Sequence, residues 1–261
     1  MLRNTLYKVN HSSVWHQSVK IWGSDYVPPT ADRLLALWLH RIGMMGVKDV
    51  ALFSKLVRPG DQVADIGANQ GLFTVLFAKK VGPKGRVFAF EPEPELYRAL
   101  TENCFRNQLE NVTNHPIAIG SEEKKLTLHR SLFNSGDNRL KAFDQAGGSV
   151  EVLSRPLDDV LQGKTLNFIK IDVQGHELQV FQGMEKTIAC SPNLKIYFEF
   201  WPYGLRNAGI APQDLIRFIR SKGLKLYYPS HSLDVEFEDT EVLEASLTGT
   251  KYSYFLAVKG S

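Results

Sequence analysis

Apolar and polar positions follow two different periods along this chain, and the two periods take turns in a regular order. Short apolar runs predict strands over residues 62–66, 86–90, 112–119, 124–129, 150–153, 166–173, 194–200, 224–228 and 252–258. Apolar positions at helical spacing predict helices over residues 48–57, 72–80, 93–108, 157–161, 176–189 and 212–222. Strands that alternate with helices imply a mostly parallel sheet with helices on both faces, so the pattern predicts a doubly wound α/β fold.

The two ends of the chain depart from this alternation. The strands at 224–228 and 252–258 have no evident helix between them, which predicts an antiparallel hairpin at one edge of the sheet. Residues 1–47 show weak periodicity up to Pro28-Pro29, followed by an amphipathic helix with Thr30 as its N-cap. We therefore expect a partly helical N-terminal extension at 1–47 and one domain at 48–261. In open sheets of this type, ligands bind beyond the carboxyl ends of the strands.

Composition narrows the function classes without choosing one. The 261 residues carry a formal net charge of +3 with both signs mixed along the chain, so no basic stripe points to nucleic acid or to an anionic membrane. Cys104 and Cys190 are too few and too distant for a disulfide framework, which favours a reducing, cytoplasmic setting. No signal peptide is evident, and the most apolar N-terminal stretch, residues 34–47, is too short for a transmembrane segment.

A glycine loop follows the first strand of the domain, in the sequence VADIGANQG at residues 63–71. Gly67 permits a tight turn close to a ligand, and Gly71 permits close packing of the helix on the strand. The G-x-x-x-G spacing lacks the glycine that makes room for a pyrophosphate in dinucleotide-binding loops. Asp65 would repel phosphate but suits the ammonium of a methionine moiety, and Glu91, at the end of the next strand, suits a ribose diol. The loop therefore favours S-adenosylmethionine over a nicotinamide cofactor.

Several motifs in order resemble the FkbM-type methyltransferase family, a branch of the class I enzymes that use S-adenosylmethionine. The resemblance covers residues 55–230 and rests on the segments VADIGANQGLFT, VFAFEPEPELY, PIAIGSEE, NSGDNRL, LNFIKIDVQGHELQVFQGM and EFWPYGL. It implies a seven-stranded Rossmann-like sheet and methyl transfer to a hydroxyl, or occasionally a carboxyl, oxygen of sugars, polyketides or related metabolites, with S-adenosylhomocysteine as the other product. By position, it implies contacts to the methionine end from Asp65, Gly67, Asn69 and Gly71, to the ribose from Glu91 with Pro92 holding the turn, and to the adenine from Ala118 and Ile119.

Three side chains at the ends of neighbouring strands are candidates for the catalytic site. An alcohol oxygen is a poor nucleophile until it loses its proton, so a positioned base near the methyl group is expected. Asp172 ends the strand in IKIDVQGHE and is the first choice, His176 opens the following helix, and Glu199 lies near the end of the next strand. Asp172 could instead hydrogen-bond the Gly175 turn. His176 could cap its helix, and Glu199 could brace Arg206. The three candidates could also hold a divalent ion, but no compact ligand motif is present and no metal is predicted.

Substrate contacts are expected from a polar loop at residues 131–149 and from an aromatic cluster. The loop side chains that would suit the hydroxyl groups of a sugar are Asn134, Ser135, Asp137 and Arg139. Trp201 and Tyr203 would form a wall against a sugar face, unless they pack in the core. We therefore expect an O-methyltransferase with a small-molecule or saccharide acceptor. A non-catalytic cofactor-binding scaffold and a nicotinamide-dependent oxidoreductase are the alternatives, and the sequence leaves the oligomeric state open.

Overall fold

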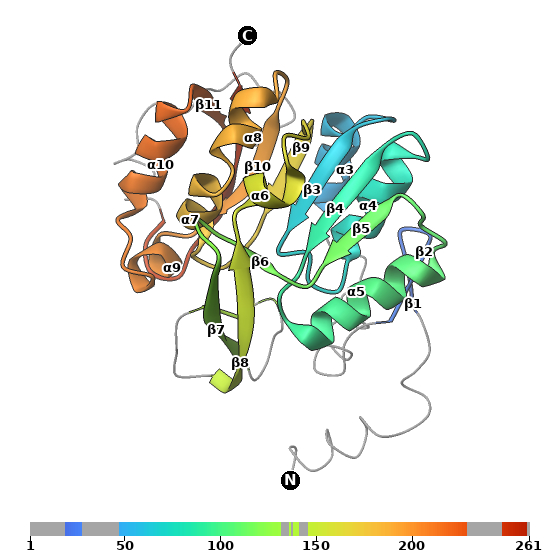
Figure 1. The fold of residues 1–261 in the computed structure, drawn as a ribbon, viewed down its shortest axis with the longest axis horizontal. Helices are drawn as coiled ribbons and strands as arrows, with labels where there is room; N and C mark the ends of the chain where they lie inside the picture. The colour runs from blue at the N-terminus through green and yellow to red at the C-terminus, as the bar shows by residue number, and fades with distance from the viewer. Residues whose placement is uncertain are drawn as a thin grey trace.

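The computed structural model describes residues 19–27, 47–131, 136, 138–140, 146–228 and 247–259 of the chain. A seven-stranded sheet in the order β11-β12-β10-β9-β3-β4-β5 runs through the centre of the domain (Figure 1). Its strands are β3 Gln62–Ile66, β4 Arg86–Phe90, β5 Val112–His115, β9 Phe168–Ile171, β10 Lys195–Phe200, β11 Leu224–Tyr227 and β12 Ser253–Lys259. Neighbours are parallel except at β12, which is antiparallel to β10 and β11. The doubly wound sheet and its antiparallel edge hairpin are therefore confirmed.

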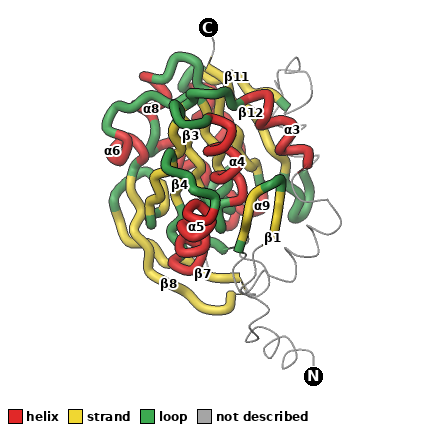
Figure 2. The backbone as a smooth tube through the Cα atoms, turned by 90° about the vertical axis from the view of Figure 1, so that its right-hand side faces the viewer, coloured by secondary structure: helices red, strands yellow, loops and turns green. Residues whose placement is uncertain are grey.

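Helices cover both faces of this sheet. The first face carries α3 Val47–Leu56, α4 Leu72–Val81 and α5 Pro94–Arg106, and the second carries α6 Leu157–Leu161, α7 Glu177–Gln182, α8 Glu185–Cys190 and α10 Pro212–Ser221. Figure 2 shows α3 on one side of the strands and α6 and α8 on the other. Successive residues of β3 alternate between the layers: Val63 is buried with Phe53, whereas Ile66 is buried with Phe181. The same alternation sends Asp65, like Val63, to the first face.

Three further strands form a separate sheet in the order β6-β8-β7, with β6 at Ala118–Ile119, β7 at Lys124–Ser131 and β8 at Ala146–Arg155. The prediction of one strand over residues 112–119 is therefore wrong. β5 ends at His115, and Pro116, which has no N–H to donate, separates it from β6. The strand predicted at 124–129 belongs to this second sheet. The strand predicted at 150–153 is longer because it pairs with β7 from residue 146 onward.

The helix predicted over 176–189 is two helices in the structure, α7 and α8. Gly183 ends α7, and its backbone packs so closely on the Gly120 carbonyl group that a side chain would clash with it. The Asp158 carboxylate accepts hydrogen bonds from the backbone N–H groups of Lys186 and Thr187, at 2.8 and 2.7 Å, and so caps the start of α8. The break therefore depends on contacts with distant segments, which the periodicity within residues 176–189 does not report.

Part of the N-terminal extension packs on the domain. Residues 19–27 form a hairpin of β1 Val19–Ile21 and β2 Ser24–Tyr26, and the Tyr26 hydroxyl donates to the Leu72 carbonyl oxygen at 2.8 Å. The Asn103 side chain of α5 accepts from the Val27 N–H at 2.7 Å. The helix predicted after Thr30 lies outside the described residues. Within the part of the chain that the structure describes, no helix combines the length and apolar character needed to cross a membrane.

Candidate active site

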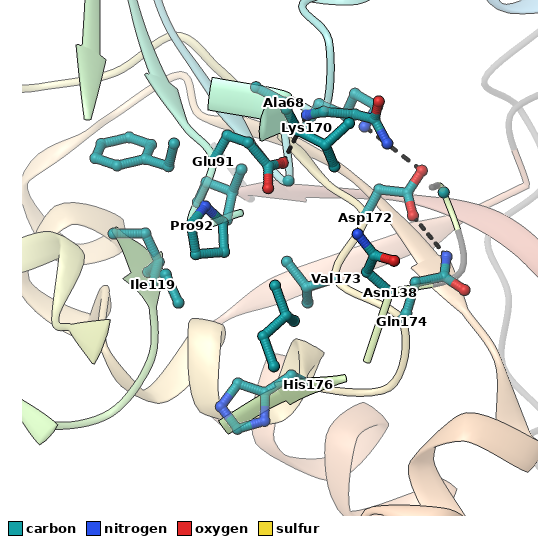
Figure 3. A pocket seen from close by; sticks show the side chains of 18 of the residues that line it. Ala68, Glu91, Pro92, Ile119, Asn138, Lys170, Asp172, Val173, Gln174 and His176 are labelled. Carbon is teal, nitrogen blue, oxygen red and sulfur yellow. Dashed lines mark hydrogen bonds and ion pairs between the residues drawn. The ribbon is translucent and has the colours of Figure 1, made fainter. Parts of the chain in front are cut away.

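The carboxyl ends of β3, β4 and β9 open into a cavity of about 370 Å³, which residues of β6 and β7 close on the other side (Figure 3). We call it the first cavity. It lies at the topological switch point of the sheet, where β3 has β4 on one side and β9 on the other. Its polar lining residues are Asn69, Gln70, Glu91, Asn138, Lys170, Asp172, Gln174 and His176. The location agrees with the ligand site expected in an open α/β sheet.

The glycine loop between β3 and α4 turns tightly at one wall of the first cavity. Gly67 and Gly71 have φ angles of +78° and +87°, in the region that favours glycine. A Cβ atom on Gly67 would clash with the carbonyl oxygen of Asp172, and one on Gly71 would lie 2.7 Å from the Leu100 side chain. Asn69 also has a positive φ, +52°, and lines the cavity. Close packing, as well as the turn itself, therefore requires both glycines.

Replacing Gly67 by alanine is expected to lower the free energy of unfolding by about 2–4 kcal/mol, because left-handed strain adds to the clash with Asp172. Gly209 is the matched control. It follows a helix end with a φ of +81°, and a Cβ atom there would meet nothing within 4 Å, so Gly209→Ala should cost only about 1 kcal/mol. Urea denaturation followed by circular dichroism measures both variants. Equal losses in the two would show that the approach to Asp172 carries no extra cost.

Glu91 follows β4, and its carboxylate is held by the backbone of two loops. Oε2 accepts from the Asn69 N–H at 2.8 Å, and Oε1 accepts from the Glu93 N–H at 2.9 Å. Burial raises the pKa of Glu91 to about 7, although these two hydrogen bonds oppose the rise. The other residues predicted for this end of the ligand that line the first cavity are Pro92, Ala118 and Ile119. Figure 3 shows Pro92 and Ile119 on the same side of the cavity as Glu91.

Asp65 is absent from the lining of the first cavity, although the sequence predicts that it contacts the methionine end. Its side chain is buried on the first face of the sheet, where Oδ2 accepts from the Thr74 hydroxyl at 2.6 Å. Oδ1 lies 3.8 Å from the Lys170 ammonium. Burial raises the pKa of the Asp65 carboxyl, while Lys170 and Thr74 oppose the rise. Asp65 therefore does not contact the cavity itself. Its carboxylate lies beside Lys170, which lines the cavity.

Lys170 is a site residue that the sequence analysis missed, because it lies within the apolar run of β9. Its ammonium is 3.5 Å from Asp172 Oδ2 and 5.3 Å from the centroid of the Phe73 ring. Burial would lower the pKa of Lys170, but the carboxylates of Asp172 and Asp65 outweigh it and the pKa is raised. The sequence contains one part of the signal, because strand alternation places Asp172 on the same face as Lys170. The pairing of Lys170 with Asp65 depends on the register of two neighbouring strands, which the structure gives.

A hydrogen-bonded bridge joins Asp172 to Glu199. The side-chain amide of Gln174 donates to Asp172 Oδ1 and to Glu199 Oε2, both at 2.9 Å. The Gln174 backbone has a φ of +54°, which is uncommon for a residue other than glycine. The Asp172 side chain is 24% exposed, whereas Glu199 is 3% exposed. Asp172 therefore presents the accessible carboxylate to the first cavity (Figure 3), and Glu199 acts on it through Gln174.

The start of α7 decides two of the structural alternatives that the sequence left open. His176 occupies the N-cap position, but its side chain makes no capping hydrogen bond, and its buried Nε2 has no partner. Burial, with a smaller contribution from Lys124, lowers the pKa of His176 to about 4, so the imidazole is neutral near pH 7. The Gly175 N–H donates to Glu177 Oε1 at 3.1 Å. Glu177, and not Asp172, therefore satisfies the Gly175 turn.

The residues predicted to contact substrate do not line the first cavity where the structure describes them. Asn134, Ser135 and Asp137 lie outside the described residues. The Arg139 guanidinium lies 4.6 Å from the centroid of the Trp201 ring. Trp201 is buried, and its Nε1 donates to the Thr250 carbonyl oxygen at 3.1 Å. Tyr203 is 40% exposed at the start of α9 Pro202–Asn207.

The catalytic candidates are also not arranged as a metal site. Among the residues that the structure describes, no group of three or more His, Cys, Asp and Glu side chains is placed to hold a metal ion. Asp172, His176 and Glu199 all belong to that part of the chain. The two carboxylates hydrogen-bond to Gln174 instead.

The family model for the methyltransferase FkbM domain matches residues 65–226, which is more than half of the chain. The chain belongs to the FkbM methyltransferase family. It is therefore an S-adenosylmethionine-dependent methyltransferase, and the scaffold and oxidoreductase alternatives are set aside. Every residue named above as lining the first cavity lies inside the matched range, so the family match and the geometry concern the same part of the molecule.

Three relatives give the family context. The chain is 29% identical to Methyltransferase 1 of Beauveria bassiana, over 62% of this chain and 72% of that protein. It is 26% identical to the hexuronic acid methyltransferase AglP of Haloferax volcanii, over 80% of this chain and 82% of that protein. It is 29% identical to the 31-O-demethyl-FK506 methyltransferase FkbM of Streptomyces tacrolimicus, over 49% of this chain and 61% of that protein.

Proposed function

We propose that this enzyme transfers a methyl group from S-adenosylmethionine to a hydroxyl oxygen of a sugar, a glycan or a related small metabolite. The observation that carries the proposal is the partly exposed Asp172 carboxylate, which lies on the wall of the first cavity between Lys170 and Gln174. An acceptor hydroxyl needs a base of this kind at the point of transfer. The names of two relatives, a hexuronic acid methyltransferase and a 31-O-demethyl-FK506 methyltransferase, support an oxygenated acceptor.

The residues of the first cavity fit the proposed cofactor. Gly67 lines the first cavity with Asn69, so loop backbone would lie beside the methionine end, while Gly71 packs the loop against Leu100 and does not line the cavity. Glu91 would accept from the ribose hydroxyls, and Ala118 and Ile119, which also line the cavity, would lie toward the adenine. Two carboxylates and one ammonium give the group of Asp65, Lys170 and Asp172 a net charge of −1 when all are ionised, which suits a positively charged sulfonium.

Asp172 is proposed as the base that accepts the proton of the acceptor hydroxyl. S-adenosylmethionine, when bound, supplies an electrophilic methyl group whose sulfur departs as a neutral thioether, S-adenosylhomocysteine. The Lys170 ammonium lies 3.5 Å from Asp172 Oδ2, and the Gln174 amide donates to Asp172 Oδ1 and orients the carboxylate. His176 has its pKa lowered to about 4, which makes it a weak base near neutral pH. Glu199 accepts a hydrogen bond from the same Gln174 amide and so fixes its position.

The proposed setting is cytoplasmic, with a small acceptor. Cys104 is buried and Cys190 is exposed, and both are free thiols, the form that a reducing compartment maintains. The net charge of +3, spread over the chain, supports a small or saccharide acceptor in preference to nucleic acid.

Titration of S-adenosylmethionine and S-adenosylhomocysteine into the protein by calorimetry tests the cofactor assignment. We expect a micromolar Kd, about −8 kcal/mol at 1 μM. Glu91→Gln should lose about 1–3 kcal/mol of this, because the ribose hydroxyls lose an ionised acceptor. Glu95→Gln, at an exposed position on α5, is the matched control and should bind like the wild type. Wild-type protein that binds neither ligand would contradict the proposed function.

The affinity for S-adenosylmethionine is expected to increase about tenfold between pH 6 and pH 8, because the pKa of Glu91 is about 7 and the ionised carboxylate is the form that accepts from the ribose. The sign follows from the raised pKa: protonation below pH 7 removes the acceptor, and deprotonation above pH 7 restores it. Calorimetry at four pH values measures the trend. Glu91→Gln should bind with little pH dependence, and an equal slope in this variant would assign the titration to another group.

A further inference from the structure

A second cavity, of about 270 Å³, adjoins the first. Its walls come from β7, α7, α9 and the segment at residues 139–140. Leu140, Gln174 and His176 line both cavities, so the two spaces meet at these residues. Figure 3 shows Gln174 beside Asp172 on the wall of the first cavity.

The loop from β9 to α7 and the start of α9 close one side of the second cavity. Gly175 has a φ of +98°, and a Cβ atom there would lie 2.7 Å from the Gly204 carbonyl carbon and oxygen. The two backbones therefore touch, and they hold α7 and α9 on adjacent walls of the cavity. Gln174 is the neighbour of Gly175 in this loop, so the residue that orients Asp172 also forms the boundary between the two spaces. An acceptor in the second cavity would therefore contact Gln174, and Asp172 would lie on the other side of that residue.

The polar groups of the second cavity are suited to hydroxyl donors. His176 Nε2 and Gln179 Oε1 are both buried without a hydrogen-bond partner, and a buried polar atom of this kind is costly unless a ligand satisfies it. The two residues are three apart at the start of α7, so they lie on one face of the helix. Asn207 adds an amide from α9. Among the described lining residues there is no Asp or Glu; the polar groups are amides, a neutral imidazole and the Arg139 guanidinium, which also lies over the Trp201 ring.

We propose that the second cavity is the acceptor site and that it takes a ring carrying vicinal hydroxyl groups. One hydroxyl donates to Gln179 Oε1, and its neighbour bonds to His176 Nε2. A third hydroxyl on the ring is then presented at the junction with the first cavity, where Asp172 lies. The inference rests on the proposed function for the direction of transfer, and it goes further by assigning the acceptor site and its chemistry. The second cavity is smaller than the first, which favours a single ring over a macrocycle.

Ligand binding to the complex with S-adenosylhomocysteine tests this assignment without requiring turnover. The probes are methyl β-D-glucopyranoside and myo-inositol, which carry vicinal hydroxyls, and cyclohexanol, which carries one. Saturation-transfer NMR should detect at least one of the two polyols and not cyclohexanol. Gln179→Met removes the acceptor oxygen at similar volume and should weaken polyol binding about tenfold. Gln182→Met, on the exposed side of the same helix, is the matched control and should leave it unchanged.

The outcomes separate this inference from the proposed function. If wild-type protein binds S-adenosylhomocysteine but neither polyol, the acceptor assignment is overturned while methyl transfer to a different hydroxyl compound stands. Equal polyol affinity in Gln179→Met and Gln182→Met would overturn the role of Gln179 and, with it, the site. If wild-type protein does not bind S-adenosylhomocysteine, the proposed function itself is contradicted, and the acceptor assignment that rests on it is contradicted as well. An unchanged Kd for S-adenosylhomocysteine in Gln179→Met, measured by calorimetry, is required to assign its effect to the second cavity.

Discussion

Replacing Asp172 by asparagine is expected to lower kcat by about 10²–10⁴-fold, the contribution typical of a positioned general base. The change keeps the shape of the side chain and one oxygen that can accept from the Gln174 amide, so the hydrogen-bonded bridge to Glu199 can persist. Only the charge and the basicity are lost. S-adenosylhomocysteine formation with an identified acceptor measures the rate, and calorimetry should show that S-adenosylmethionine still binds.

Two further variants locate the base. Asp159→Asn, at an exposed position in α6, controls for the loss of one carboxylate and should keep full activity. Glu199→Gln should lower kcat less than Asp172→Asn, because Glu199 is buried behind Gln174 and acts on Asp172 from there. If Asp172→Asn retains wild-type kcat, Asp172 is not the base. A large loss confined to Glu199→Gln would move the assignment to that residue.

Replacing Lys170 by methionine is expected to lower the free energy of unfolding by about 3–5 kcal/mol, because it leaves the buried Asp65 carboxylate without its cation. Burial already raises the pKa of Asp65, and loss of the ammonium raises it further. A carboxyl with a raised folded-state pKa stabilises the fold at low pH and loses that contribution as the pH rises through the folded-state value. The decrease in the free energy of unfolding of Lys170→Met relative to the wild type should therefore be larger at pH 8 than at pH 5, as measured by urea denaturation.

A double-mutant cycle distinguishes this ion pair from a general packing effect. Asp65→Asn removes the charge that Lys170 neutralises, so the double variant should be more stable than the sum of the two single losses predicts. Lys55→Met, at an exposed position on α3, is the matched control for replacing a lysine and should stay within about 0.5 kcal/mol of the wild type. Strict additivity in the cycle would contradict coupling between Asp65 and Lys170.

The order of elements could be predicted from the sequence because each prediction depends on a local period. The apolar runs of the central strands follow from residues close together in the chain. The errors at residues 112–119 and 176–189 have different causes, the first local and the second a set of distant contacts. Pro116 separates two strands that join different sheets, and Gly183 ends α7 against Gly120 while Asp158 starts α8.

The sequence by itself determined the doubly wound fold, the glycine loop and the placement of Glu91 and Asp172 at strand ends, because each depends on residues within a few positions of one another. Only the tertiary structure decided that Asp65 lies behind the cavity, that Lys170 pairs with two carboxylates, and that His176 is neutral. Ionisation and accessibility depend on burial and on charges from neighbouring strands. Those neighbours are far apart in the chain, so no local pattern contains them.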